Sequence, residues 1–176
     1  WAPDSRHIVF GSDRNDGTAK LYWMRADGGG EAQRIAEHKI GSGVLPASFW
    51  RDGSRLVYQL WGGATRQDVW ILPLDLADPD HPKPGKAEPL LHNPYNEYSP
   101  AFSPDGRWLA YRTMESGSSQ VYVAPFPGPG GKYQVSTGGG DYPLWSRTAR
   151  ELFYRNNAGQ IMVAGYAVQG EIFVPE

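Results

Sequence analysis

The stretch Ser103–Tyr111 reads SPDGRWLAY, and an aromatic residue, Phe102, stands directly before it. Its Pro-Asp-Gly segment favours a tight turn, because proline fixes φ, aspartate bonds back to the backbone and glycine accepts positive φ. Apolar and aromatic residues flank this turn on both sides, which is typical of β-strands. The stretch therefore predicts two antiparallel strands joined by a tight turn.

The same spacing recurs four times along the chain. An aromatic residue is followed seven positions later by an aliphatic residue and, two positions after that, by a ring: Trp1/Ile8/Phe10, Phe49/Leu56/Tyr58, Phe102/Leu109/Tyr111 and Trp145/Leu152/Tyr154. A short apolar pair follows each set, at Leu21-Tyr22, Val69-Trp70, Val121-Tyr122 and Ile161-Met162. Self-similarity at a period of roughly 40–50 residues indicates a repeat architecture, and each repeat reads as strands alone. We therefore predict an all-β fold, a β-propeller of about four four-stranded antiparallel blades.

The repeat at 99–140 shows how a blade is built. Strands are expected at 99–103, 107–113, 120–126 and 132–136, with turns and a Pro/Gly-rich loop between them. The whole chain is expected to be a single propeller segment with blades at 1–45, 46–98, 99–140 and 141–176. The first strands of the last three blades are expected near 46–50, 99–103 and 141–146. The first blade lacks most of its innermost strand, because the chain begins at Trp1, so we expect a fragment of a larger propeller.

The composition excludes several classes of protein. The 176 residues include 22 Gly and 15 Pro, yet 40% are hydrophobic and there are 7 Trp and 10 Tyr, which a disordered chain would lack. The net charge of −2, without a basic stripe, disfavours a nucleic-acid partner. There is no cysteine for a disulfide or a thiolate metal site, and no apolar run approaches the roughly 20 residues of a membrane span. We expect no cofactor, no metal and no membrane insertion.

The quoted stretch, followed ten residues later by Val121-Tyr122, resembles the TolB-like, WD-repeat-like propeller motif, and the resemblance spans essentially the whole chain. The segment 121–145, continued by Glu151–Tyr154 and Gly159–Met162, resembles the propeller region C-terminal to some bacterial serine/threonine protein kinases. Related repeats also occur in TolB itself and in the propellers of prolyl-oligopeptidase-type peptidases. The resemblance implies a bacterial propeller and favours an extracytoplasmic or periplasmic location.

No catalytic motif is visible in the sequence. Gly138-Gly139-Gly140 lacks the spacing of a kinase phosphate loop and is expected to be a plain loop, and no Gly-x-Ser-x-Gly elbow of a serine hydrolase occurs. Asp13–Gly17 is one residue short of a calcium loop, so we expect a hairpin turn there. No two histidines stand at metal-ligand spacing, and we expect each at the surface or in a loop: His7, His38, His81 and His92. The chain is therefore predicted to be non-catalytic.

Two segments, Asn93–Ser99 and Gly138–Pro143, lead into first strands and are expected to project from one rim of the propeller. They carry the candidate binding residues Tyr95, Asn96, Glu97, Tyr98, Asp141 and Tyr142. Tyrosine among short polar residues is a mixture that binding surfaces favour, because it joins a large, stiff contact area to hydrogen bonds. The alternative is that Tyr98 and Tyr142 pack the top of their strands.

Two classes of function are carried forward. We predict a recognition, scaffold or sensory module of a larger bacterial protein, such as a receptor kinase, with a protein or small-molecule ligand at the propeller rim. The alternative is a hydrolase. Glu97 and Asp141 precede equivalent strands, where a propeller glycosidase places paired carboxylates, or the chain is the accessory propeller of a prolyl-oligopeptidase-type peptidase.

A homodimer is expected for a physical reason. An open arc of blades exposes apolar faces and unpaired sheet edges, and a second copy would cover them in a two-fold dimer that closes the ring. The expected contacts lie in the first and last blades, at Ile8–Phe10, Leu21–Trp23, Leu152–Tyr154 and Ile161–Val163.

Overall fold

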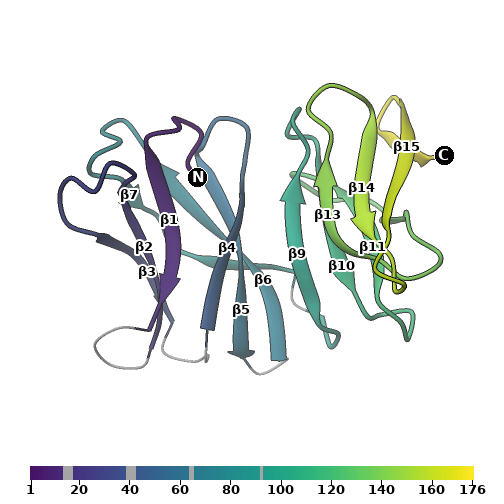
Figure 1. The fold of residues 1–176 in the computed structure, drawn as a ribbon, viewed down its shortest axis with the longest axis horizontal. Helices are drawn as coiled ribbons and strands as arrows, with labels where there is room; N and C mark the ends of the chain where they lie inside the picture. Colours follow the sequence, from purple (N-terminus) through teal and green to yellow (C-terminus); the bar gives the residue numbers. More distant parts are fainter. Residues whose placement is uncertain (14–17, 39–42, 64–65, 92) are drawn as a thin grey trace. The chain divides into compact units, whose positions relative to one another are not determined.

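The computed structural model describes residues 1–13, 18–38, 43–63, 66–91 and 93–176. Within these residues the fold is all-β, with sixteen strands in four antiparallel sheets and no helix (Figure 1). The predicted β-propeller class is therefore confirmed. The chain divides into two compact units, Trp1–Pro94 and Tyr95–Glu176, and each unit contains two of the sheets.

The first sheet of the first unit has three strands, in agreement with the expectation that the first repeat lacks its innermost strand. The strands are β1 (His7–Ser12), β2 (Ala19–Arg25) and β3 (Gln33–His38), in the order β1-β2-β3. The fourteenth to seventeenth residues lie outside the described part of the chain, so the hairpin turn expected at Asp13–Gly17 does too.

The second sheet has five strands, where four were expected. They are β4 (Gly43–Phe49), β5 (Arg55–Gly63), β6 (Arg66–Asp75), β7 (Lys83–Pro84) and β8 (Glu88–Leu91). Both short strands, β7 and β8, pair with β6. Proline has no N–H for a ladder hydrogen bond, so a proline-rich outer segment divides into two short pieces of strand.

Burial in the first unit follows the pattern expected for stacked blades. Five successive residues of β5, Leu56–Leu60, are buried, so both faces of this strand are covered. Their core includes Leu21 and Trp23 of β2 and Leu72 of β6, which are also nearly inaccessible. The two sheets of this unit therefore share one hydrophobic core.

The second unit contains two four-stranded sheets. The first consists of β9 (Glu97–Phe102), β10 (Trp108–Thr113), β11 (Gln120–Pro125) and β12 (Tyr133–Gln134). The second consists of β13 (Asp141–Trp145), β14 (Glu151–Arg155), β15 (Ile161–Gln169) and β16 (Ile172–Pro175). The first strands expected near 46–50, 99–103 and 141–146 are present as β4, β9 and β13, although β4 and β9 begin three and two residues earlier.

The two sheets of the second unit pack through large rings. Trp108 of β10, Trp145 of β13 and Phe173 of β16 belong to one buried cluster with Leu152 of β14. The indole Nε1 of Trp145 donates a hydrogen bond of 2.9 Å to the carbonyl of Ala101 in β9, which ties the two sheets together. Of the recurrent rings, Tyr58, Phe102, Tyr111 and Trp145 are buried, whereas Trp1 in the first repeat is 77% exposed.

The turn between the first and second strands shows why the motif needs its Asp and Gly. Gly53 and Gly106 have φ of 78° and 72°, a region that L side chains rarely adopt. In the first repeat Ser5 takes the same role with φ of 56°. The fourth repeat has Ala149 at this place, and its φ is not positive. Here the N–H of Ala149 donates a hydrogen bond to the hydroxyl of Ser146.

The first strands β4, β9 and β13 share an irregularity. Pairing with the second strand shifts register at one point in each, which is the mark of a β-bulge. In β9 and β13 the shift coincides with a non-glycine residue of positive φ, Ser99 (50°) and Tyr142 (52°), and each stands directly before a proline. A bulge re-aims the neighbouring side chains, here those at the rim end of the strand.

The segments expected at a dimer contact differ in exposure. Leu21–Trp23 is buried inside the first unit, and Leu152 is inaccessible. Ile161 and Val163 of β15 are exposed, at 69% and 54%. The homodimer stays a prediction, and of its expected contacts these residues of β15 offer the accessible apolar surface.

Candidate functional site

Three of the six candidate binding residues come together with two arginines in the second unit. At the end of β10, Arg112 places its guanidinium carbon 4.3 Å from the ring centroid of Tyr98 and its Nη1 3.4 Å from Oδ2 of Asp141. At the end of β14, Arg155 lies 4.7 Å from the ring centroid of Tyr142 and 3.9 Å from the same carboxylate oxygen. One carboxylate is thus shared by two arginines, each of which lies over a tyrosine ring.

The repeat explains why the two arginines meet. Arg112 follows the repeat ring Tyr111, and Arg155 follows the repeat ring Tyr154, so they hold equivalent places in successive repeats. The sequence analysis did not select them. The signal that would have found them is that shared place directly after the ring, which puts both residues at the same end of neighbouring sheets.

Hydrogen bonds fix one side of the site more than the other. Nε of Arg112 donates to Oγ of Ser119 at 2.6 Å, and that hydroxyl donates to the carbonyl of Gly140 at 2.8 Å. The side chains of Arg112 and Asp141 are 21% and 19% exposed, whereas that of Arg155 is 48% exposed. The side chain of Arg112 is therefore held in one position, whereas that of Arg155 is accessible to solvent.

A cavity of about 440 Å³ lies against these groups. It is lined by Arg112, Ser119, Asp141, Arg155 and the hairpin 156–159. Asn156 holds the hairpin, because its Oδ1 accepts the N–H groups of Ala158 and Gln160. The lining carries two guanidinium groups and one carboxylate, so the cavity has an excess of positive charge and suits an anionic or strongly polar ligand.

The glycine-rich segment 138–140 is a loop, as expected, and it packs closely against the hairpin 156–159. Gly139 has φ of 86°, and a Cβ there would lie 2.2 Å from side-chain atoms of Asn157. The lack of a side chain at Gly139 therefore lets the loop approach Asn157, which lines the cavity.

The other three candidate residues lie apart from the cavity lining. Tyr95 is 41% exposed, Asn96 is half-buried and Glu97 is only 2% exposed at the start of β9. Burial is the main cause that raises the pKa of Tyr111, and the charge of Glu97 adds to it. A glycosidase pair needs two carboxylates that face the substrate, and here Glu97 is buried while Asp141 contacts two arginines. This arrangement gives the glycosidase alternative no support.

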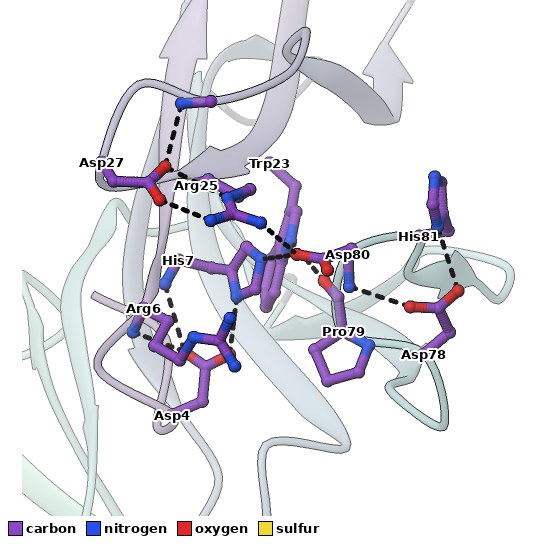
Figure 2. A network of polar contacts seen from close by, with 11 residues as sticks. Asp4, Arg6, His7, Trp23, Arg25, Asp27, Asp78, Pro79, Asp80 and His81 are labelled. Atoms are coloured by element: carbon purple, nitrogen blue, oxygen red, sulfur yellow. Dashed lines mark hydrogen bonds and ion pairs between the residues drawn. The ribbon is translucent and has the colours of Figure 1, made fainter.

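A second polar network, which the sequence analysis did not anticipate, lies in the first unit (Figure 2). His7 is 1% exposed, and its two ring nitrogens lie 2.6 Å from Oδ2 of Asp4 and 3.0 Å from Oδ1 of Asp80. Its ring stacks on Trp23 at 5.1 Å. The expectation that His7 lies at the surface or in a loop was wrong, because it occupies the repeat place of the buried Trp108.

This network fastens the long loop after β6 to the first sheet. Besides the contact of His7 with Asp80, Nε1 of Trp23 donates to the carbonyl of Pro79 at 2.9 Å, and Nε2 of Gln33 donates to the carbonyl of Pro82 at 2.8 Å (Figure 2 shows the first two). A cavity of about 530 Å³ lies beside it. The main polar groups of the network bond to one another, so its role is structural: it holds the loop against the first sheet.

The remaining histidines differ in setting. His38 lies in β3, half-buried, with Nε2 2.7 Å from the hydroxyl of Tyr58, and burial lowers its pKa, so the loop or surface expectation was wrong for it. His81 is exposed in the loop after β6, as expected, and His92 lies outside the described residues. Across the described ranges, no three His, Asp or Glu side chains are placed to hold a metal ion. No helix long and apolar enough to cross a membrane occurs in the same ranges.

Comparison with solved structures supports the fold. The chain is similar to a TolB-type protein from Agrobacterium tumefaciens, with a TM-score of 0.72, 16% identity, and coverage of 95% of this chain and 56% of that one. It is also similar to TolB from Acinetobacter baumannii, with a TM-score of 0.68, 18% identity, and coverage of 99% and 41%. The chain therefore has a TolB-type β-propeller fold, and the predicted resemblance is confirmed for the fold. The resemblance to kinase-associated propellers stays a prediction.

Comparison with curated sequences gives one relative at low identity. The chain is 27% identical to the "Uncharacterized peptidase YuxL" of Bacillus subtilis (strain 168) over an alignment of 139 residues. This alignment covers 63% of the chain. The matched region is 20% of that protein, so the chain spans a small part of its length. No family model matches the chain.

Proposed function

We propose that this chain is a non-catalytic recognition module of a larger bacterial protein and that its ligand binds at the cavity beside Arg112, Asp141 and Arg155. The observation that carries the proposal is the paired-arginine cavity itself. It joins a fixed arginine, Arg112, and an exposed arginine, Arg155, around one space of ligand size. The sequence predicted Asp141 and Tyr142 as binding residues from their place at the rim.

The groups at this cavity favour binding over catalysis. Ser119 is the hydroxyl in its lining, and a serine nucleophile needs an adjacent base. The second unit, residues 95–176, contains no histidine in its sequence. The hydroxyl of Ser119 donates instead to the carbonyl of Gly140, and the carboxylate of Asp141 contacts both arginines.

Hydrolysis assays on the whole chain test the non-catalytic role. A panel of chromogenic glycosides and peptides should give no turnover above background. Turnover that disappears in Asp141→Asn would contradict the proposal, because that substitution removes the one carboxylate of the cavity. Turnover that disappears in Glu97→Gln would contradict it as well, because Glu97 is the second carboxylate of the glycosidase alternative.

A second candidate function is the accessory propeller of a peptidase. The relative named as a peptidase favours it, and in that case the catalytic domain lies in another part of a longer protein. The sequence of the complete gene separates the two. A Gly-x-Ser-x-Gly domain beside this region would favour the peptidase, and a kinase domain upstream would favour a receptor.

The location of the protein belongs to the same proposal. A recognition propeller of the TolB type is expected on the extracytoplasmic side of the cell. Fractionation of the native host, with an antibody against this chain, checks it, and recovery in the cytoplasmic fraction would contradict it.

A further inference from the structure

We propose that the cavity beside Arg112 and Arg155 binds the carboxylate group of its ligand. This inference rests on the proposed recognition function and names the ligand chemistry of the same site. The ligand chemistry is a monoanionic carboxylate with a hydroxyl or amide group close to it. Such a group is presented by a free hydroxy acid or by an acidic residue of a peptide.

The charge of the lining is the first step. Arg112 and Arg155 contribute two positive charges and Asp141 one negative charge, which leaves one positive charge. A single carboxylate neutralises that excess. A phosphate dianion would place a second negative charge beside Asp141, so the cavity disfavours it relative to a carboxylate.

The geometry of the arginines is the second step. Arg112 is held by Ser119 at 2.6 Å and by Asp141 at 3.4 Å, and its guanidinium carbon lies 4.3 Å from the ring centroid of Tyr98. Arg155 stands 3.9 Å from Asp141, which is beyond hydrogen-bond distance, and is 48% exposed. A guanidinium offers a fork of N–H donors that matches a carboxylate, and the ring of Tyr142 beneath Arg155 helps to hold that fork in place.

The polar neighbours are the third step. The cavity of about 440 Å³ falls within the range of small-ligand sites, roughly 300–1,000 Å³. Ser119 and Asn157 in its lining can hydrogen-bond a hydroxyl or an amide near the carboxylate. A bare carboxylate therefore binds more weakly than one with such a neighbour.

Chemical-shift titration of the ¹⁵N-labelled whole chain tests the inference with four probes. Gluconate represents a free hydroxy acid, acetyl-Ala-Glu-Ala-amide an acidic peptide, glucose the neutral analogue of gluconate, and inorganic phosphate the dianion. Gluconate or the peptide should shift the amide signals of Ser119, Tyr142 and Gly159, and glucose should not. The stronger of the two carboxylate probes identifies the source of the ligand.

Matched variants make the assignment specific. Arg155→Gln should weaken carboxylate binding by about tenfold or more, because a hydrogen bond to a charged group is lost. Arg155→Lys keeps the positive charge but lacks the fork of N–H donors, so its affinity for the carboxylate should lie between those of the parent chain and Arg155→Gln. Arg147→Gln is the control, since Arg147 is exposed in the turn between β13 and β14, at the other end of those strands. Asp141→Asn should strengthen phosphate binding, because it removes the repelling charge.

Each outcome decides a separate point. Binding of glucose at the same signals, without binding of either carboxylate, would overturn the ligand class and leave the recognition role standing. Carboxylate binding that Arg147→Gln weakens as much as Arg155→Gln would overturn the site, because it would reflect net charge alone. No shift with any probe would overturn the carboxylate assignment, while the non-catalytic role is decided by the hydrolysis panel.

Discussion

Replacement of Leu152 by alanine tests whether the second unit is held together as a pair of stacked blades. Leu152 is inaccessible in β14, and its neighbours in the buried cluster include Trp145 and Phe173. The substitution removes the equivalent of three methylene groups, or about 2.4 kcal/mol at about 0.8 kcal/mol each. Large rings collapse poorly into the space left behind, and the cavity term brings the expected loss to about 3–4 kcal/mol.

Urea unfolding followed by tryptophan fluorescence measures this loss. With an m-value of about 2 kcal/mol/M, the midpoint should fall by roughly 1.5–2 M. Leu144→Ala is the matched control, because Leu144 lies in the adjacent strand β13 and is 65% exposed, so its substitution should change stability by no more than about 0.5 kcal/mol. A loss below about 1 kcal/mol for Leu152→Ala, or an equal loss for the control, would refute blade stacking at this position.

Three further changes test other features. Asp80→Asn removes the charge that faces His7 but keeps an oxygen acceptor. Because Asp80 is 45% exposed, the free energy of unfolding should fall by about 1 kcal/mol or less. An unchanged thermal midpoint would show that this contact does not hold the loop to the first sheet. Burial raises the pKa of Asp4, but hydrogen bonds from Arg6 and His7 outweigh burial and hold that pKa below 3.8 in the folded chain. The ionised carboxylate therefore stabilises the fold above pH 3.8, and this stabilisation is lost as the pH falls through the lower folded-state pKa. Asp4→Asn should therefore flatten the acid-unfolding curve, and a curve as steep as that of the parent chain would contradict the linkage. Val163→Glu places a charge on the exposed face of β15 and should weaken the expected homodimer, which gel filtration with light scattering would show; a monomeric parent chain would refute the dimer.

Much of the fold could be predicted because the repeat motif carries local physical constraints. Asp52 and Asp105 each accept a backbone N–H two residues later, as their place in a tight turn requires. The ring of Trp145 is buried against the neighbouring sheet of its unit, and the ring of Phe102 is buried beside Phe126. Such features depend on a few adjacent residues, so a single sequence is enough to place them.

The division of the outer strand in the second sheet was harder to foresee. The segment from Asp75 to Lys86 contains Pro79, Pro82 and Pro84, which indicate a loop, but its sequence does not show that Lys83–Pro84 pairs with the end of β6. That pairing depends on the length of β6, which runs on to Asp75, and on the contacts of Trp23 and Gln33 with the loop. Contacts between residues far apart in the chain decide it.

The candidate site was predicted in part for the same reason. Asp141 and Tyr142 stood out because they stand at the start of a first strand; Asp141 lines the cavity, and Tyr142 contacts Arg155 of the lining. Arg112 and Arg155 looked like ordinary charged residues at strand ends, since their meeting requires two repeats to stack in register. Glu97 looked equivalent to a rim residue, but it is buried at the start of β9.

The bulges at Ser99 and Tyr142 divide β9 and β13 into two stretches that differ in pairing register. C-terminal to the bulge, Phe102 and Trp145 are buried and therefore constrained by packing. N-terminal to it the register has shifted, so a substitution at the rim end leaves the alternation of the packed end untouched. Duplicated blades can therefore inherit their packing unchanged while their rims diverge, and the equivalent positions held here by a tyrosine and an aspartate, four residues before each ring, have already done so. Substitutions at the rim end of a strand can therefore change binding specificity without a change in the packing of its other end.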